Sequence, residues 1–178
     1  VVGLLTLGAM LFWGMASVVH LTNDTNFCIS CHEMKENNFA EYSQTIHAKN
    51  RTGVQASCSD CHVPHDTIGL LKRKVLAAND VWHHLLGTID TPEKFEQRRS
   101  ELASRVWQHM KSTDSQECRS CHNVQAMDPD AQGPTARKQH RKMQSEGKTC
   151  IDCHYGIAHH EPNDGTEPSD IVVLEKNR

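Results

Sequence analysis

The feature that most constrains this chain is a five-residue motif, C-x-x-C-H, that occurs four times. The motifs cover residues 28–32, 58–62, 118–122 and 150–154 and use all eight cysteines of the sequence. In chain order these are Cys28, Cys31, Cys58, Cys61, Cys118, Cys121, Cys150 and Cys153. Two thiols three positions apart can form thioethers to the two vinyl groups of one haem, and the next histidine can reach the iron. Four covalently bound haems c are therefore expected.

Other uses of paired cysteines explain this pattern less well. A zinc ribbon pairs two C-x-x-C units but needs no histidine after each of them. A thioredoxin-like motif would occur once, beside a βαβ pattern, and structural disulfides would leave the four motif histidines unexplained. Because haem attachment of this kind takes place outside the cytoplasm, the cysteine-bearing part is expected to face the periplasm.

The first nineteen residues, Val1 to Val19, carry no charged side chain. As a helix at about 1.5 Å per residue they would cover roughly 28 Å, close to the hydrocarbon thickness of a bilayer, about 30 Å. The alternative is a cleaved secretory signal, whose apolar region is usually only about 7–15 residues long. Ala16-Ser17-Val18 is a poor cleavage site. We expect residues 1–20 to be a retained anchor in the bacterial inner membrane and the single transmembrane helix of the chain.

The spacing of the motifs indicates an internal duplication. They begin at residues 28, 58, 118 and 150, at intervals of 30, 60 and 32 residues. A pair, a gap and a second pair predict two dihaem units, at about 21–66 and 112–161, joined by a helical linker at 67–111. The tetrahaem periplasmic domain is thus expected at 21–161, followed by a polar C-terminal tail at 162–178 that is mobile or contacts a partner.

Four further histidines follow the same duplication. His47 lies eleven residues before Cys58, and His140 lies ten before Cys150. A histidine also follows the last residue of a motif in each unit, at His65 and His159. Surface histidines have no reason to keep this register, whereas a low-spin haem needs a sixth iron ligand that neutral imidazole supplies. These four histidines are the expected pool of distal ligands.

The expected fold class is mainly α-helix and loop, because no alternating strand pattern persists. Thr91-Pro92-Glu93 is typical of a helix start, and apolar residues follow at helical spacing from Phe95 to Met110. A second helix is expected after Pro64. Its apolar stripe, predicted to pack against haem or another helix, consists of Ile68, Leu71, Val75, Ala78, Trp82 and Leu85. A shorter helix carrying His140 is expected between Gly133 and Gly147.

The sequences that link the motifs resemble one known family. The stretches that carry the likeness are Cys58–His65 (CSDCHVPH), Gly87–Phe95 (GTIDTPEKF), Ser115–Asn123 (SQECRSCHN), Thr149–His154 (TCIDCH) and Gly156–His159 (GIAH). They are similar to the NapC/NirT family of membrane-anchored tetrahaem quinol dehydrogenases, which includes the NrfH type, and most closely to its NapC branch. The likeness runs from the anchor to His159 and does not include the tail.

This resemblance implies an unusual first haem. In such proteins the motif reads C-x-x-C-H-x-M and the methionine is the iron ligand, which here matches Met34. The alternative is that Met34 only packs and His32 is the ordinary ligand. With Met34 on the first haem, His62, His122 and His154 are expected as proximal ligands of the others. His47, His65 and His140 would then complete three low-spin sites, partly by exchange between the units, and His159 would be spare.

The resemblance also implies a quinol site beside the first haem at the membrane surface. The matching acidic and basic residues are Asp80 and Arg73, which are seven residues apart and so share a helix face. A carboxylate there can accept the protons that quinol oxidation releases. The alternative is that Lys72-Arg73-Lys74 is a basic run that meets lipid headgroups. His83 and His84, one turn further on, are candidates for proton relay.

The expected function is transfer of electrons from a membrane quinol, menaquinol or ubiquinol, through four haems to a periplasmic reductase or cytochrome. One alternative is a tethered electron-transfer wire without its own quinol site, and another is an anchor and assembly subunit of an oligomeric complex. The expected partners are the quinol, the lipid bilayer and the redox protein, and no nucleic acid is among them. A wire would have four six-coordinate haems and no quinol pocket, against which Met34 and Asp80 argue.

Overall fold

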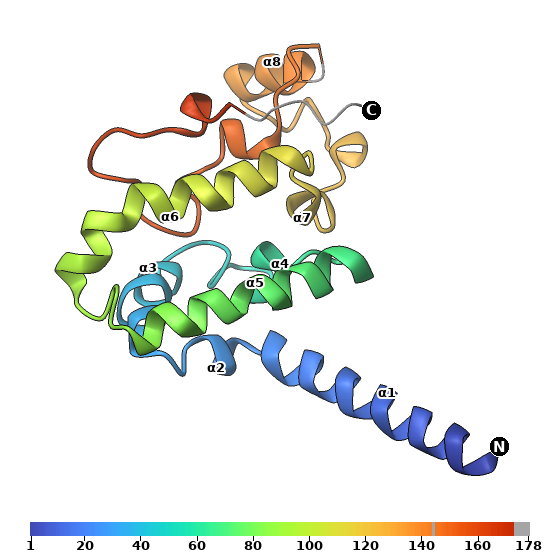
Figure 1. The fold of residues 1–178 in the computed structure, drawn as a ribbon. Coiled ribbons are helices and arrows are strands. Elements are labelled where there is room, and N and C mark those ends of the chain that lie inside the picture. Colours follow the sequence, from blue (N-terminus) through green and yellow to red (C-terminus); the bar gives the residue numbers. More distant parts are fainter. Residues whose placement is uncertain (144, 173–178) are drawn as a thin grey trace.

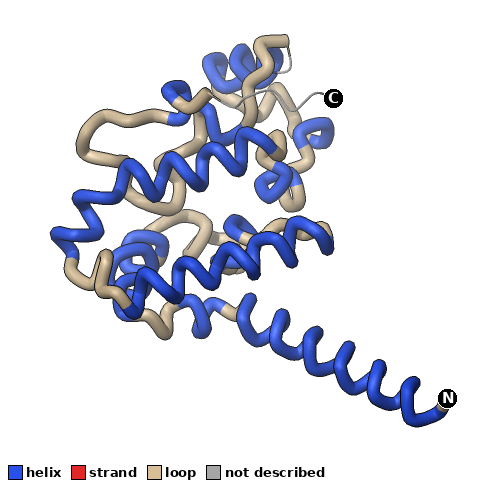
Figure 2. Tube along the Cα trace, in the orientation of Figure 1, coloured by secondary structure: helices blue, strands red, loops and turns tan. Residues whose placement is uncertain are grey.

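The computed structural model describes residues 1–143 and 145–172, and this part of the chain contains helices, turns and loops but no strand (Figure 2). The predicted α and loop class is confirmed. The three long helices are α1 (Val2–Asn23), α5 (Thr67–Leu85) and α6 (Pro92–Ser112). The shorter ones are α2 (Thr25–Cys28), α3 (Ala40–Tyr42), α4 (Cys58–His62), α7 (Gln116–Arg119) and α8 (Pro134–Met143), with a π-helical turn η1 (Met34–Phe39) and 3₁₀ turns η2 (Val124–Ala126), η3 (Cys150–Asp152) and η4 (Pro168–Asp170).

Helix α1 projects away from the rest of the molecule (Figure 1). It is long and apolar enough to cross a bilayer, and none of its residues is buried. A helix of 22 residues with apolar side chains all round needs an apolar solvent. The prediction of one N-terminal apolar helix that fits a single membrane anchor is therefore confirmed.

The remaining chain forms two tiers, one built on α5 and the other on α6 (Figure 1). The first tier contains residues 24–86 with the first two motifs, and the second contains residues 91–172 with the last two. The turn between them is tight, since Gly87 has φ +61° and a Cβ there would lie 2.8 Å from Asp90 Oδ2. Lys94 closes this turn by donating to the Gly87 carbonyl (3.0 Å) and to Asp90. Helices α5 and α6, which make up most of residues 67–111, lie one in each tier, and the division into two dihaem units with a linker stays a prediction.

Helix α6 begins as its sequence predicts. Thr91 is the N-cap and accepts a hydrogen bond from the Lys94 amide, and Pro92 is the first helical residue. Phe95 and Met110 are buried, so the apolar side of this helix faces the interior. Helix α8, which carries His140, also lies between Gly133 and Gly147 as predicted.

Helix α5 forms where expected, with Asp66 as its N-cap, but it does not pack as expected. All six residues of its predicted apolar stripe, called here the α5 stripe, are exposed, with Ile68 80%, Val75 74% and Leu85 71% accessible. Of the two coverings predicted for this stripe, haem or another helix, no helix of the described residues supplies one.

The apolar core is small and belongs mostly to the second tier. The buried apolar residues of the described chain are Ala48, Phe95, Trp107, Met110 and Ile151. Trp107, Met110 and Ile151 form one cluster, against which Cys61 of the first tier also packs. A folded domain of this length normally buries far more apolar side chains, so this core alone is too small for its size.

The segment after Pro162, expected as a tail, is docked on α6 as far as Ile171. Lys111 Nζ donates to the carbonyl oxygen of Pro168 (2.7 Å), Pro168 is fully buried, and Ile171 packs on the Trp107 cluster. Residues 173–178 of the predicted tail lie outside the described residues.

Candidate haem sites and the first-motif cluster

Each pair of motif cysteines lies on a short helical turn whose ends are fixed by local hydrogen bonds. In the second motif Ser57 and Asp60 form a capping box, in which Asp60 Oδ2 accepts from the Ser57 amide (2.6 Å). In the fourth motif Thr149 and Asp152 do the same (2.8 Å). The aspartate of C-S-D-C and of C-I-D-C therefore has a structural role, since it holds the two thiols on one turn.

Motifs that follow one another in the chain also lie next to one another in space. Helices α2 and α4, which carry Cys28 and the second motif, contact each other. Helices α4 and α7, which carry the second and third motifs, also contact each other across the tiers. Ser115, buried at the start of the third motif, accepts a hydrogen bond from the Ile151 amide of the fourth (3.2 Å). The attachment turns thus form a continuous row from the anchor to the second tier.

Every motif histidine faces one other histidine ring. The ring centres are 6.0 Å apart for His32 and His84, 6.1 Å for His62 and His159, 6.3 Å for His47 and His122, and 6.0 Å for His140 and His154. A metal–imidazole bond is about 2.0–2.1 Å, and the ring centre lies roughly 1.1 Å beyond the nitrogen, so two imidazoles on one iron have centres about 6.2 Å apart. The four pairs therefore have the separation that a bis-histidine haem needs.

Three of the paired histidines have a pKa below the ordinary value. Burial, followed by the nearby His159, lowers the pKa of His62 to about 4. Burial likewise lowers the pKa of His159 and of His154. These rings are neutral at pH 7, which is the form that binds iron. Together with the small apolar core, the donor set fits four haems, whose apolar rings would supply the missing interior.

One of these pairs differs from the expected distal ligands. The structure brings His159, which was expected to be spare, opposite His62, whereas His65 is exposed and outside the four pairs. His47 lies opposite His122 of the other unit, as an exchange of ligands requires, and His140 lies opposite His154 of its own unit. The pairs His62–His159 and His47–His122 each join one tier to the other.

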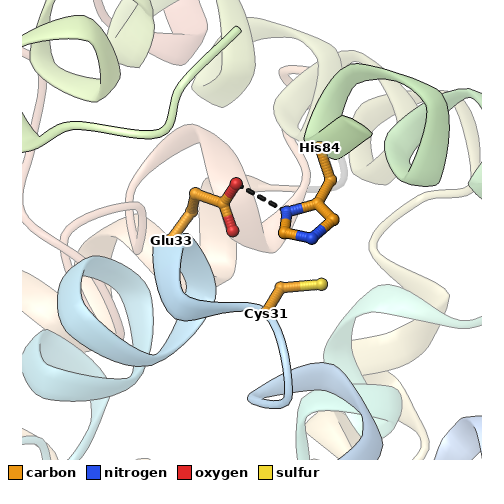
Figure 3. A group of neighbouring side chains, drawn as sticks. All are labelled: Cys31, Glu33 and His84. Carbon is orange, nitrogen blue, oxygen red and sulfur yellow. Dashed lines mark hydrogen bonds and ion pairs between the residues drawn. The ribbon is translucent and has the colours of Figure 1, made fainter. Parts of the chain in front are cut away.

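The first motif has a buried carboxylate beside it. Cys31, Glu33 and His84 gather in one cluster, with His84 reaching it from α5 (Figure 3). Glu33 is only 2% exposed, and its Oε1 accepts from His84 Nδ1 (2.7 Å) while Oε2 lies 3.6 Å from His32 Nδ1. The other ring nitrogen of His32 is 3.1 Å from the Asp90 carbonyl oxygen. His84 was expected only as a proton relay, and Glu33 was not singled out from the sequence although it lies inside the C-x-x-C-H-x-M stretch.

Met34 directly follows Glu33 in the chain, and the predicted charged residues lie on α5, the helix that also carries His84. The Met34 sulfur is half-buried at the start of η1 and accepts from Asn38 Nδ2 (3.5 Å). Arg73 and Asp80 form an ion pair on α5 (2.9 Å), as their spacing predicts. Lys74 Nζ donates to the Thr22 carbonyl at the end of α1 (3.0 Å), and His83 Nδ1 lies 3.0 Å from Thr88 Oγ1.

A buried ion pair between Arg99 and Glu41 lies beside His159. The Arg99 side chain, 6% exposed, bonds the Glu41 carboxylate, Glu96 and the His160 carbonyl oxygen. Glu41 also accepts from the His160 amide (2.9 Å) and lies 3.8 Å from His159 Nδ1. Burial pushes the pKa of Glu41 upward, but the hydrogen bonds from Arg99 and His160 outweigh it, so the pKa lies below its ordinary value. Glu41 and Arg99 are far apart in the chain, and no local pattern indicates their contact.

The motif turns, the paired imidazoles and the apolar N-terminal helix together define a c-type cytochrome with a membrane anchor. The model of the NapC/NirT cytochrome c family, N-terminal region, matches residues 1–164, and the chain belongs to this family. A protein of Allochromatium vinosum that carries a tetrahaem cytochrome c name is 50% identical, with 94% of this chain and 90% of that protein covered.

Two further relatives carry the names of the family. The denitrification system component NirT of Stutzerimonas stutzeri is 49% identical over 93% of this chain and 84% of its own length. The cytochrome c-type protein NapC of Escherichia coli K12 is 45% identical over 88% of this chain and 78% of its own length. No solved structure matches the chain.

Proposed function

We propose that this protein is a membrane-bound quinol dehydrogenase that passes electrons from a bilayer quinol through four haems c to a periplasmic reductase or cytochrome. The observation that carries the proposal is the continuous row of attachment turns, which begins directly after the anchor and ends in the second tier. Bound haem iron supplies one-electron redox chemistry. The α1 anchor keeps the first of these sites at the membrane, and the row leads away from it.

The chain itself supplies the iron ligands. His62 with His159, His122 with His47, and His154 with His140 are the proposed ligand pairs of the second, third and fourth haems, supported by their separations of 6.0–6.3 Å. This assignment replaces the expected distal ligand His65 with His159. The family likeness assigns Met34 to the first haem. The alternative ligand, His32, has both ring nitrogens beside other groups, since one lies 3.1 Å from the Asp90 carbonyl oxygen and the other lies 3.6 Å from Glu33 Oε2.

The proposed quinol-handling residues are Asp80 and Arg73. Oxidation of a quinol releases two protons, and the Asp80 carboxylate is a suitable acceptor because it is exposed on α5, the helix that also carries His84 to the first motif. Arg73, 2.9 Å from it, positions the carboxylate. The substrate would enter from the inner membrane, and the haem domain would face the periplasm.

The test is quinol oxidation by detergent-purified holoprotein, with haem reduction followed by absorbance. Asp80→Asn keeps the shape of the side chain and removes the proton acceptor, so reduction by quinol should fall at least tenfold while reduction by dithionite is unchanged. The matched control is Glu101→Gln, which removes one carboxylate from the exposed Arg105 pair on α6. Equal quinol rates in D80N and wild type would refute the role of Asp80. No quinol-dependent reduction in the wild type would favour a tethered wire fed by another redox protein.

A further inference from the structure

Most of the exposed large apolar residues of the described haem domain lie on α5, and the α5 stripe is its uncovered apolar side. Its residues recur at spacings of three and four from Ile68 to Leu85, so they lie along one side of the helix. Trp82 is 58% exposed, and Leu86, beyond the helix, adds 59%. An apolar patch of this length on a protein surface marks a contact with something else.

The haem sites lie on a different side of α5. His84, which reaches Glu33 and Cys31, is about 150° around the helix from the middle of the stripe at roughly 100° per residue. Leu70, Arg73 and Ala77, on the same side as His84, are half-buried. The stripe therefore points away from the attachment turns, and bound haem does not explain it.

The stripe is continuous with the membrane anchor. Lys74, which lies at one edge of the stripe, donates to the Thr22 carbonyl where α1 ends. Helix α1 itself is apolar and wholly exposed, so the bilayer surface is located where α1 meets the haem domain. The end of α1 and helix α2 lie beside α5 in Figure 1. Residues held this close to the emerging anchor are at the level of the lipid headgroups.

The composition of α5 also fits a lipid surface. Lys72 and Lys74 lie on either side of the stripe near the start of the helix, and cationic side chains beside an apolar face are attracted to anionic headgroups. Trp82 is an aromatic of the kind enriched at the membrane interface. Helix α6, of similar length, has no such face, because its apolar residues are buried and its exposed residues are mostly charged or polar.

We propose that α5 is a second membrane-associated element, an amphipathic helix that lies in the plane of the bilayer with the α5 stripe inserted among the headgroups and upper acyl chains. The partner is the phospholipid surface that α1 crosses. This inference stands on the exposed stripe and its link to α1, and it does not depend on quinol oxidation by Asp80.

The test uses the full-length holoprotein in nanodiscs of phosphatidylcholine and phosphatidylglycerol that contain a phospholipid with a photoactivatable diazirine on its acyl chain. After illumination, mass spectrometry should find labels in α1 and on the α5 stripe, with peptides of α5 labelled at least fivefold more than those of α6. A water-soluble diazirine should show the reverse preference. Labelling of α5 by the soluble probe alone would refute the proposal. Protection from both probes would also refute it and would indicate a protein partner or a second copy.

Two charge variants separate insertion from folding. Val75→Glu places a carboxylate in the stripe, and lipid labelling of α5 should fall several-fold while labelling of α1 is retained. Gln108→Glu, on an exposed position of α6, is the matched control and should change neither. Four haems per chain and full reduction by dithionite show that both variants are folded. Unchanged α5 labelling in V75E would overturn the proposal whatever the quinol rate.

Discussion

Helices α5 and α6 have similar lengths and both have an apolar side, yet they use it in opposite ways. In α6 that side forms the core, with Phe95, Trp107 and Met110 buried. In α5 it faces outward, and no residue of the helix is buried. The difference is that α6 has the fourth motif and the C-terminal segment packed on it, whereas α5 is tied to the end of α1. Helical periodicity thus predicts that an apolar side exists but not what covers it.

The tiers built on these helices are joined by two histidine pairs, and removing one ligand should produce the largest change. His159→Ala takes the second-tier ring away from His62 of the first tier. One haem of four should change from low spin to high spin, as measured by electron paramagnetic resonance and absorbance. His65→Ala should leave the spectrum unchanged, because His65 is exposed and unpaired with a motif histidine in the described chain. The opposite result would restore His65 as the ligand.

Helices α5 and α6 each carry a tryptophan, so the two helices can be compared by how much stability the protein loses when that tryptophan is removed. Trp107 is 5% exposed and Trp82 is 58% exposed. Trp107→Ala should lower the free energy of unfolding by about 3–5 kcal/mol, because it empties part of the buried cluster that Trp107 forms with Met110 and Ile151. Trp82→Ala should change it by less than about 0.5 kcal/mol in detergent. Guanidinium titrations of the holoprotein, followed by circular dichroism, measure both, and equal losses would contradict the contrast between the helices.

The loss of stability should likewise be larger when Arg99 of α6 is replaced than when Arg73 of α5 is replaced. Arg99→Met leaves the Glu41 carboxylate buried without its main partner, which should cost about 3 kcal/mol. Arg73→Met breaks an exposed pair and should cost less than about 1 kcal/mol. The same titrations apply. A small loss in R99M would mean that water reaches Glu41 readily and that the pair does not hold the tiers together.

A smaller change in folding stability is expected when the pH is lowered. The pKa of Glu41 lies below its ordinary value of 4.5 in the folded protein, so the unfolded state binds its proton first. Stability from this group is therefore present above pH 4.5 and is lost as pH falls through the lower, folded pKa. Wild type should lose stability more steeply than Glu41→Gln between about pH 5 and pH 3. Parallel curves for the two proteins would show that Glu41 does not contribute to acid sensitivity.

The sequence predicts features that depend on neighbouring residues better than features that depend on contacts between distant parts of the chain. Thr91-Pro92 and Gly133 set the limits of α6 and α8 through local hydrogen bonds and backbone geometry, so those helices were predictable. The C-x-x-C-H motif contains the attachment chemistry of one haem within five residues. The anchor was predictable because its length alone matches a bilayer.

Contacts across the tiers were not predictable from local patterns. His159 follows its own motif closely in the chain, which indicated a spare histidine, but its ring lies opposite His62 of the second motif instead. The bond between Glu41 and Arg99 joins α3 to α6, and neither residue lies in a motif. The orientation of α5 rests on long-range hydrogen bonds, from Lys74 to Thr22 and between His84 and Glu33, which no local pattern indicates.

The crossing of His62 with His159 has a consequence for how the protein is made. Attachment turns leave the translocation channel in chain order, so the second motif is exposed long before its partner near the C-terminus arrives. On the proposed ligand assignment, the second haem site would therefore gain its second histidine only when nearly the whole chain has been exported. Completion of that site would then report that the polypeptide is intact, because chains truncated before residue 159 would lack this histidine.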